Sequence, residues 1–232
     1  MYNTHKDFGS GDKICHHGVM DMFRIPKFAA AAYASQSDHK PVLEPATHWT
    51  RGDRSEAMIT PIVVFTNCDS VRLTSGGEDL GLFYPVREHY PALKHPPVVI
   101  HCQDNGWGLD MSGAVFTGYE NGKAVVERSY IASSLPTQLI LKADDTRLSS
   151  GPWDTTRFVC TLADDCGNPL FYAFEPVQFT VEGPAEIIGP KCVSLIGGQI
   201  GFWIRTTGEP GEIRVSARTQ NLESPVIKVT VE

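Results

Sequence analysis

The sequence predicts an all-β protein in which two β-sandwiches follow one another along the chain. From Pro41 onward the helical spacing of apolar residues disappears, and apolar and polar residues alternate along short runs instead. Gly, Pro, Asn or Asp separates these runs at regular intervals, as turns between strands require. A chain of 232 residues with 41% hydrophobic and 20% charged residues has the composition of a globular protein of one or two domains.

The first sandwich is expected over about residues 40–131. Residues 61–66 (PIVVFT) and 70–75 (SVRLTS) have the composition of strands, with a tight turn at residues 67–69 between them. Gly76 and Gly77 form the next turn. Further strands are predicted at 97–102, 112–120 and 123–130, with a hairpin turn at Asn121–Gly122 and a surface loop at 82–97.

The second sandwich is expected over residues 132–232. Its predicted strands are 137–144, 157–164, 176–183, 199–206, 211–219 and 225–232. Their number and spacing are typical of an Ig-like architecture, although neither sandwich has the antibody-type Cys-Trp-Cys arrangement. The six cysteines are expected to be free and mostly buried, and Cys160 and Cys166 are the pair that would face each other across a hairpin.

Residues 1–39 differ from the rest of the chain. Residues 2–17 are polar and Gly-rich, which predicts a loop, and a short apolar run follows from Gly18. Pro26 is then expected in the first turn of a helix over the Ala-rich residues 27–36. Asp21 and Arg24 are candidates for an ion pair at the start of this helix, and Trp49, Trp153 and Trp203 for core or interface positions.

This segment resembles part of a known family. The order Asp7-Phe8-Gly9, a polar loop, the run GVMDMFRIPK (18–27) and an Ala-rich helix is similar to the end of the catalytic (β/α)8 barrel in glycoside hydrolase family 2. That family contains β-galactosidases, β-glucuronidases and β-mannosidases, and its C-terminal domains are Ig-like. The resemblance implies that residues 1–39 are a loop-helix remnant of the barrel and that the chain is the C-terminal part of a β-galactosidase-like enzyme.

The resemblance also implies which residues contact the sugar. Asn3 and His5 correspond to the mouth of the barrel above its eighth strand, where (β/α)8 enzymes build their sites. His17 falls where β-galactosidases have an Asn that binds sodium and the sugar, and where β-glucuronidases have a Lys that grips the uronate. The glucuronate clamp is therefore absent. For the pair His16–His17 a metal site, a hydrogen bond to a sugar hydroxyl and a structural role remain alternatives, and no metal or cofactor is assigned.

No catalytic residue is expected in this chain. Retaining glycosidases need two carboxylates about 5–5.5 Å apart, and in this family the acid/base follows an Asn on the fourth barrel strand. The sequence has no Asn-Glu pair, no Gly-x-Ser-x-Gly nucleophile elbow and no HExxH motif. The chain alone is therefore expected to be inactive, although its parent is expected to hydrolyse β-linked sugars.

Charge and hydropathy exclude other partners. The net charge is −7 without any basic run, which weighs against nucleic acid and anionic membranes, and no apolar stretch approaches the about 20 residues of a membrane span. No secretory signal is visible near Met1. Because the N-terminus is expected to be truncated, cytoplasmic and exported locations both stay open. The oligomeric state stays open too, with a homo-oligomer among the alternatives.

Two hypotheses from different classes follow. The chain is either the C-terminal part of a family 2 glycosidase, or a self-standing pair of Ig-like modules that binds carbohydrate or protein. The helix distinguishes them, because its stripe of Phe28 and Ala32 calls for a neighbour such as a barrel.

Overall fold

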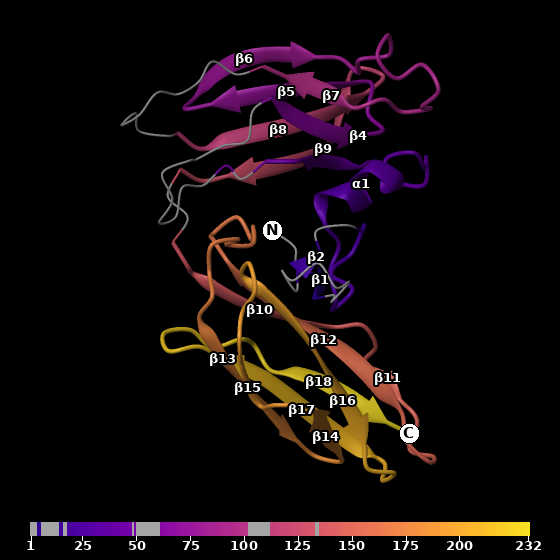
Figure 1. Ribbon diagram of the computed structural model, residues 1–232, viewed down its shortest axis with the longest axis vertical. Coiled ribbons are helices and arrows are strands. Elements are labelled where there is room, and N and C mark those ends of the chain that lie inside the picture. The colour runs from indigo at the N-terminus through magenta and orange to yellow at the C-terminus, as the bar shows by residue number, and fades with distance from the viewer. Residues whose placement is uncertain are drawn as a thin grey trace. The chain divides into compact units, whose positions relative to one another are not determined.

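The protein is described from a computed structural model (Figure 1). The structure describes residues 18–47, 49, 61–101, 112–132 and 135–232, and the backbone of residues 4–5 and 14–15. Contacts divide the chain into two compact units: Asp21–Ile25 belong with Leu135–Glu232, whereas Pro26–Ser134 form most of the other.

Within its described residues, the first sandwich has seven antiparallel strands in two sheets. One sheet has the order β3-β4-β7, with β3 at Leu43–Pro45, β4 at Ile62–Thr66 and β7 at Val98–Ile100. The other has the order β6-β5-β8-β9, with β5 at Ser70–Ser75, β6 at Glu78–Phe83, β8 at Ala114–Glu120 and β9 at Lys123–Tyr130.

Alternation along these strands builds the core between the two sheets. Every second residue is buried along β4 and along β8 as far as Gly118, because successive side chains of a strand point to opposite faces. Trp49 lies edge-on to Phe116 with ring centroids 5.9 Å apart, and its indole N–H donates to the Ser112 carbonyl at 2.9 Å. The predicted core position of Trp49 is therefore confirmed.

The second sandwich pairs a four-stranded sheet with a five-stranded one. The first has the order β10-β12-β16-β14, with β10 at Gln138–Ala143, β12 at Thr155–Ala163, β14 at Ala185–Ile188 and β16 at Gln199–Thr206. The second has the order β11-β18-β17-β13-β15, with β11 at Arg147–Leu148, β13 at Pro176–Glu182, β15 at Cys192–Ser194, β17 at Gly211–Arg218 and β18 at Ile227–Val231.

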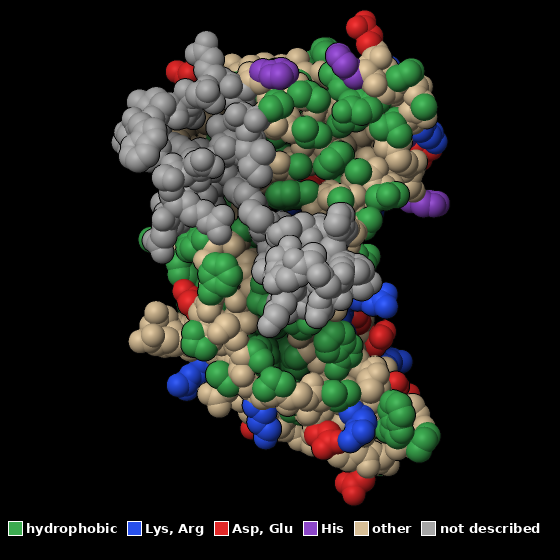
Figure 2. Space-filling view, viewed as in Figure 1, with side chains coloured by type: hydrophobic (Ala, Val, Ile, Leu, Met, Phe, Trp, Pro, Cys, Tyr) green, Lys and Arg blue, Asp and Glu red, His purple; other side chains and the backbone are tan. Residues whose placement is uncertain are grey.

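Aromatic stacking joins the two sheets of this second sandwich. Phe202 on β16 stacks on Phe179 of the opposite sheet with centroids 3.9 Å apart, and on Phe158 of β12 at 5.3 Å. On the face drawn in Figure 2, acidic and basic side chains lie interspersed over this sandwich. The predicted all-β class with sandwich domains is thus confirmed.

As far as the segment before the sandwiches is described, it contains helix α1 and a small two-stranded sheet. Helix α1 spans Phe28–Ala34, and its extended N-cap is Lys27. Pro26 therefore lies before the N-cap, where it forms an isolated bridge with Met20, so its predicted place in the first turn is wrong. Strands β1 (Thr4–His5) and β2 (Ile14–Cys15) pair antiparallel.

The helix has neighbours within its own unit. It contacts β3 and β4 of the first sandwich, while Tyr33 on the opposite face is 71% exposed. The Phe28–Ala32 stripe is half-buried on this sandwich. The helix therefore no longer distinguishes a barrel neighbour from a free-standing module. In the part of the chain that is described, no helix has the length and hydropathy to cross a bilayer.

Candidate functional site

The sequence-predicted sugar residues lie at the edge of what the structure describes. Asn3 and His17 fall outside the described residues. His5 lies in β1, where its backbone pairs with Ile14 of β2, and its side chain is likewise outside the description. The contact of these three residues with a sugar stays a prediction.

A closed turn over Asp21–Ile25 follows directly after this region. The Asp21 carboxylate accepts the backbone N–H groups of Phe23 and Ile25, both at 2.8 Å, and the Asp21 N–H donates to the Ile25 carbonyl at 3.0 Å. Arg24 has a φ of +60°, the left-handed region that is costly for a residue with a Cβ. The carboxylate of Asp21 therefore stabilises a strained backbone; the predicted ion pair with Arg24 is not what holds this turn.

The residues at the tip of the turn alternate in burial. Met22 and Arg24 are exposed, whereas Phe23 is half-buried and Ile25 is buried. Below the tip, the Lys27 N–H donates to the Val19 carbonyl at 3.0 Å and closes the segment. The turn is therefore held by its own hydrogen bonds and places the Phe23 side chain against the second sandwich.

Phe23 packs on the outer face of the sheet β10-β12-β16-β14, in the same compact unit. Its ring centroid lies 6.4 Å from that of Trp203, and its carbonyl accepts a hydrogen bond of 2.6 Å from the Arg157 guanidinium. Two further bonds of 2.8 and 3.0 Å hold the same guanidinium on the Asp144 carboxylate. Phe23 also lies against Gly201, where a Cβ would come within 2.7 Å of the Phe23 Cβ. We call Arg157, Gly201 and Trp203 the Phe23 seat.

The sequence carries a signal for one member of the seat. Gly201 interrupts the strand QIGFWIRT, and a glycine inside a strand commonly marks the close approach of another part of the chain. The hydrogen bond from Arg157 to Phe23 has no such signal, because an Arg in a predicted strand is usually on the solvated face.

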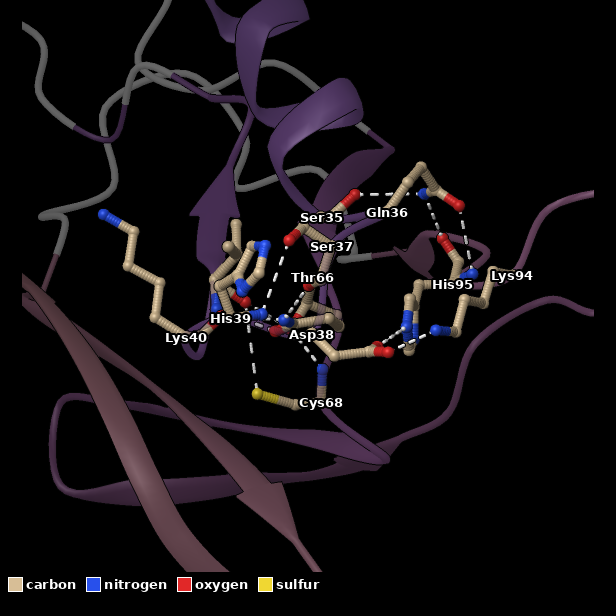
Figure 3. Close-up of polar contacts among 12 residues, drawn as sticks. Ser35, Gln36, Ser37, Asp38, His39, Lys40, Thr66, Cys68, Lys94 and His95 are labelled. Carbon is tan, nitrogen blue, oxygen red and sulfur yellow. Dashed lines mark hydrogen bonds and ion pairs between the residues drawn. The ribbon is translucent and has the colours of Figure 1, made fainter.

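A polar cluster surrounds the exit of α1 (Figure 3). The Gln36 amide donates to the His95 carbonyl at 2.7 Å and accepts the His95 backbone N–H at 3.1 Å. Asp38 pairs with Lys94 and, at 2.7 Å, with the His95 ring. Hydrogen bonds from Lys94 and then His95 lower the pKa of the Asp38 carboxyl.

This cluster serves structure rather than chemistry. The Ser35 hydroxyl donates to the Ala32 carbonyl at 3.1 Å, and Asn67 binds the carbonyls of Ser37 and Lys40 through its amide. The sequence predicted only a turn at Asn67, whereas its amide also fixes the chain leaving the helix. Nothing in this arrangement activates a hydroxyl, because the hydroxyl of Ser35 is committed to the helix backbone.

Other sequence predictions are corrected by the second sandwich. Trp153 is 59% exposed and belongs to neither core, so its predicted core position is wrong, while the alternative of an interface position stays a prediction. Cys160 lies in the core with no exposed surface, whereas Cys166 is exposed, and both thiols are free. Asp164 at the following turn is fully buried, and its carboxylate accepts the N–H groups of Cys166 and Asn168 at 2.9 Å each.

A cavity of about 410 Å³ lies between β13 and β14. Its lining mixes apolar and charged side chains, among them Phe179, Ile187, Glu186 and Lys191. Across the described ranges, no three His, Cys, Asp or Glu side chains come close enough together to hold a metal ion.

Comparison with known proteins relates the chain to glycosidases. Residues 139–228 match the family model of the glycoside hydrolase family 2 C-terminal domain 5. A β-galactosidase of Thermoanaerobacterium thermosulfurigenes is 43% identical over 206 residues, which cover 85% of this chain and 29% of that protein. A β-galactosidase of Rhizobium radiobacter is 37% identical over 111 residues, which cover 48% of this chain and 80% of that protein.

Solved structures agree on the fold. A β-glycosidase from Bacteroides vulgatus has a TM-score of 0.72 at 20% identity, covering 94% of this chain and 28% of that one. The chain belongs to glycoside hydrolase family 2. Within that family it corresponds to a β-galactosidase-like C-terminal region, and it spans less than a third of the Thermoanaerobacterium enzyme. The resemblance found in the sequence is thereby confirmed, whereas the assignment of residues 1–39 to a barrel stays a prediction.

Proposed function

We propose that this chain is the C-terminal part of a retaining β-galactosidase. In this proposal residues 1–39 close the catalytic barrel, Asn3, His5 and His17 form one wall of the sugar pocket, and the two sandwiches buttress the barrel. The observation that carries the proposal is the 43% identity with a β-galactosidase over 85% of the chain.

The chemistry is divided between this chain and the rest of the enzyme. The acid/base and the nucleophile, about 5–5.5 Å apart in retaining enzymes, come from the barrel strands that precede residue 1. The chain contributes binding, because the imidazole of His17 can form a hydrogen bond with a sugar hydroxyl. The lack of a Lys at this position favours a neutral sugar such as galactose over a uronate.

A chimera tests the proposal. The full 232-residue chain replaces the matching part of the Thermoanaerobacterium β-galactosidase, and hydrolysis of o-nitrophenyl β-D-galactoside is measured. We expect galactosidase activity from the chimera, none from the chain alone, and none from the truncated relative. Hydrolysis by the chain alone would contradict the proposal. A folded chimera that is inactive, together with glycan binding by the chain alone, would favour the stand-alone binding module.

Substitution of His17 tests the pocket wall. In the chimera, His17→Ala should raise KM for the galactoside about threefold to tenfold, since it removes one hydrogen bond to the sugar. His39→Ala is the matched control, because His39 is exposed on the chain after α1. An unchanged KM in His17→Ala would remove His17 from the pocket.

A further inference from the structure

The cavity between β13 and β14 lies on an open side of the second sandwich. β14 is the last strand of the four-stranded sheet, and β13 is followed only by the short β15 at the end of the five-stranded sheet. The chain passes from β13 to β14 through Gly183 and Pro184, so the two sheets separate from this turn and leave about 410 Å³ between them. That volume falls within the about 300–1,000 Å³ of typical ligand sites.

The free edge of β14 directs backbone groups without a strand partner toward this cavity. The Thr207 N–H donates to the Pro184 carbonyl at 3.0 Å, so the backbone of Pro184 faces β16. Backbone groups of successive residues in a strand point to opposite sides. Glu186 therefore also faces β16, whereas the N–H and carbonyl of Ile187, which lines the cavity, face the free edge. In the described part of the chain no strand lies beyond β14, so these groups form a template on which a further strand can pair.

The edge of β14 lacks the features that usually protect an exposed strand. β14 pairs with β16 without a bulge and contains no proline. Its one charged side chain, Glu186, is compensated by Arg205 of β16, whose Nε donates to the carboxylate at 3.1 Å. Ile188 on the same strand is 51% exposed. Because native proteins normally protect such edges with bulges, prolines or charges, β14 is open to pairing with another chain.

The cavity has an apolar floor and one uncompensated positive charge. Phe179 is buried, and Val181, Ala185 and Ile187 pack against the same core. Lys191 also lines the cavity, and its carbonyl accepts the Phe179 N–H at 2.8 Å. Within the described ranges, no carboxylate forms an ion pair with the ammonium group of Lys191. An occupant with apolar side chains toward the floor and one acidic side chain near Lys191 complements this lining.

We propose that the cavity between β13 and β14 is a peptide-binding groove. An extended segment of another polypeptide pairs with the free edge of β14, directs apolar side chains onto Phe179 and Val181, and places an acidic side chain beside Lys191. Strand addition of this kind takes affinity from main-chain hydrogen bonds and specificity from alternate side chains. A small carboxylate would use Lys191 but not the backbone of Ile187. The groove goes beyond the proposed function and does not depend on it, because all of its residues belong to the second sandwich.

Binding of a model strand to the full chain tests the groove. The probe is an acetylated and amidated pentapeptide of alternating valine and threonine that ends in glutamate, and a second probe ends in lysine instead. We expect the glutamate peptide to bind with a dissociation constant below about 1 mM, and at least about threefold more tightly than the lysine peptide. Isothermal titration calorimetry measures both affinities.

Reversal of one charge tests the part of Lys191. Lys191→Glu should weaken binding of the glutamate peptide about tenfold, because attraction becomes repulsion, and should strengthen binding of the lysine peptide. Lys142→Glu is the matched control, since Lys142 is exposed on β10 at the opposite end of the same sheet and its reversal changes the net charge equally. Unchanged or tighter binding of the glutamate peptide by Lys191→Glu would overturn the proposal, because Lys191 would then only shield the edge.

Hydrogen exchange tests the pairing with β14. In the free chain the Ile187 amide should exchange faster than the Ile204 amide of β16, and saturating glutamate peptide should slow exchange at Ile187 about fivefold or more. The same peptide with all of its amides N-methylated cannot donate to the Ile187 carbonyl and should bind at least about tenfold more weakly. This comparison leaves the protein unaltered, so it does not depend on the folding of a variant.

The outcomes distinguish the possible occupants. The proposal fails if neither peptide binds saturably at millimolar concentration, or if exchange at Ile187 stays unchanged at saturation. Equal binding of the N-methylated peptide would make the groove a site for a free carboxylate and would overturn strand pairing. A free chain that sediments as a dimer, and as a monomer after Ile187→Pro, would mean that a second copy fills the groove, because proline removes the N–H at the free edge.

Discussion

At the scale of single residues, Glu44 is a carboxyl group that the fold disfavours when it is charged. Burial raises the pKa of Glu44, and Arg128, whose guanidinium lies 3.3 Å away, opposes this only in part. The folded state therefore holds this proton more tightly than the unfolded state. The contribution of protonated Glu44 to the free energy of unfolding is fully present at pH values below the pKa that Glu44 has in the unfolded state. It is lost as the pH rises through the higher pKa that Glu44 has in the folded state.

Replacement of Glu44 should change the pH dependence of stability. The free energy of unfolding of the wild type, minus that of Glu44→Gln, should fall as pH rises through the titration of Glu44, as urea titrations at several pH values would measure. Asp38→Asn is the control with the opposite sign, because its lowered pKa gives stability that is lost as pH falls. A difference that does not vary with pH would show that Glu44 ionises freely.

Asp164 offers a second residue-scale prediction. Its buried carboxylate accepts two backbone N–H groups and the Asn168 side chain. Asp164→Ala should lower the free energy of unfolding by about 2–4 kcal/mol because buried donors lose their acceptor, whereas Asp164→Asn should cost less. The neighbouring Asp165 is exposed, so Asp165→Ala should leave the urea midpoint nearly unchanged.

At the scale of elements, Gln36 joins α1 to the loop before β7. Its amide makes two hydrogen bonds with the backbone of His95, in the manner of a strand pair. Gln36→Ala should raise hydrogen exchange at the His95 amide about threefold or more, with little change in β4. Lys94→Ala should have almost no effect, since Lys94 makes an exposed ion pair. Equal exchange in both variants would mean that Gln36 does not hold the loop.

The elements also show what sequence patterns can reveal. Strands in which apolar residues alternate with others, such as β5 and β16, were predicted nearly to the residue, because one buried face imposes a period of two. The exposed strand β6 was missed, and its last residues were assigned to a loop, because a strand without a buried face has no such period. Its hydrogen-bonded pairing with β5 maintains it.

The candidate site was predictable only in part. The motif GVMDMFRIPK indicated the family, but only a short apolar run was predicted before the helix, and the turn over Asp21–Ile25 was not. The partner of that turn could not be predicted, because the Phe23 seat unites residues more than a hundred positions apart in the chain. Contacts between residues that lie far apart in the sequence leave little signal in the local pattern, except where a residue such as Gly201 interrupts a strand.

At the scale of the whole molecule, two separate hydrophobic cores carry the stability. Phe116 is fully buried in the first core and Phe179 is buried in the second. We expect Phe116→Ala to lower the unfolding transition of the first sandwich by about 3–5 kcal/mol, and Phe179→Ala that of the second, because each leaves a cavity in its own core. Calorimetry on the full chain would resolve the two transitions. A shift of both by either variant would mean that the cores unfold as one.

The second core also contains a thiol whose reactivity reports how often the second sandwich opens. Burial raises the pKa of Cys160 to about 12, so an alkylating reagent at neutral pH meets almost no thiolate while the sandwich is closed. Exposed Cys192 on β15 reacts without any opening and gives the reference rate. The alkylation rate of Cys160, divided by that of Cys192, therefore measures how often the second sandwich opens. No cysteine has to be introduced for this measurement, because both thiols are in the natural sequence.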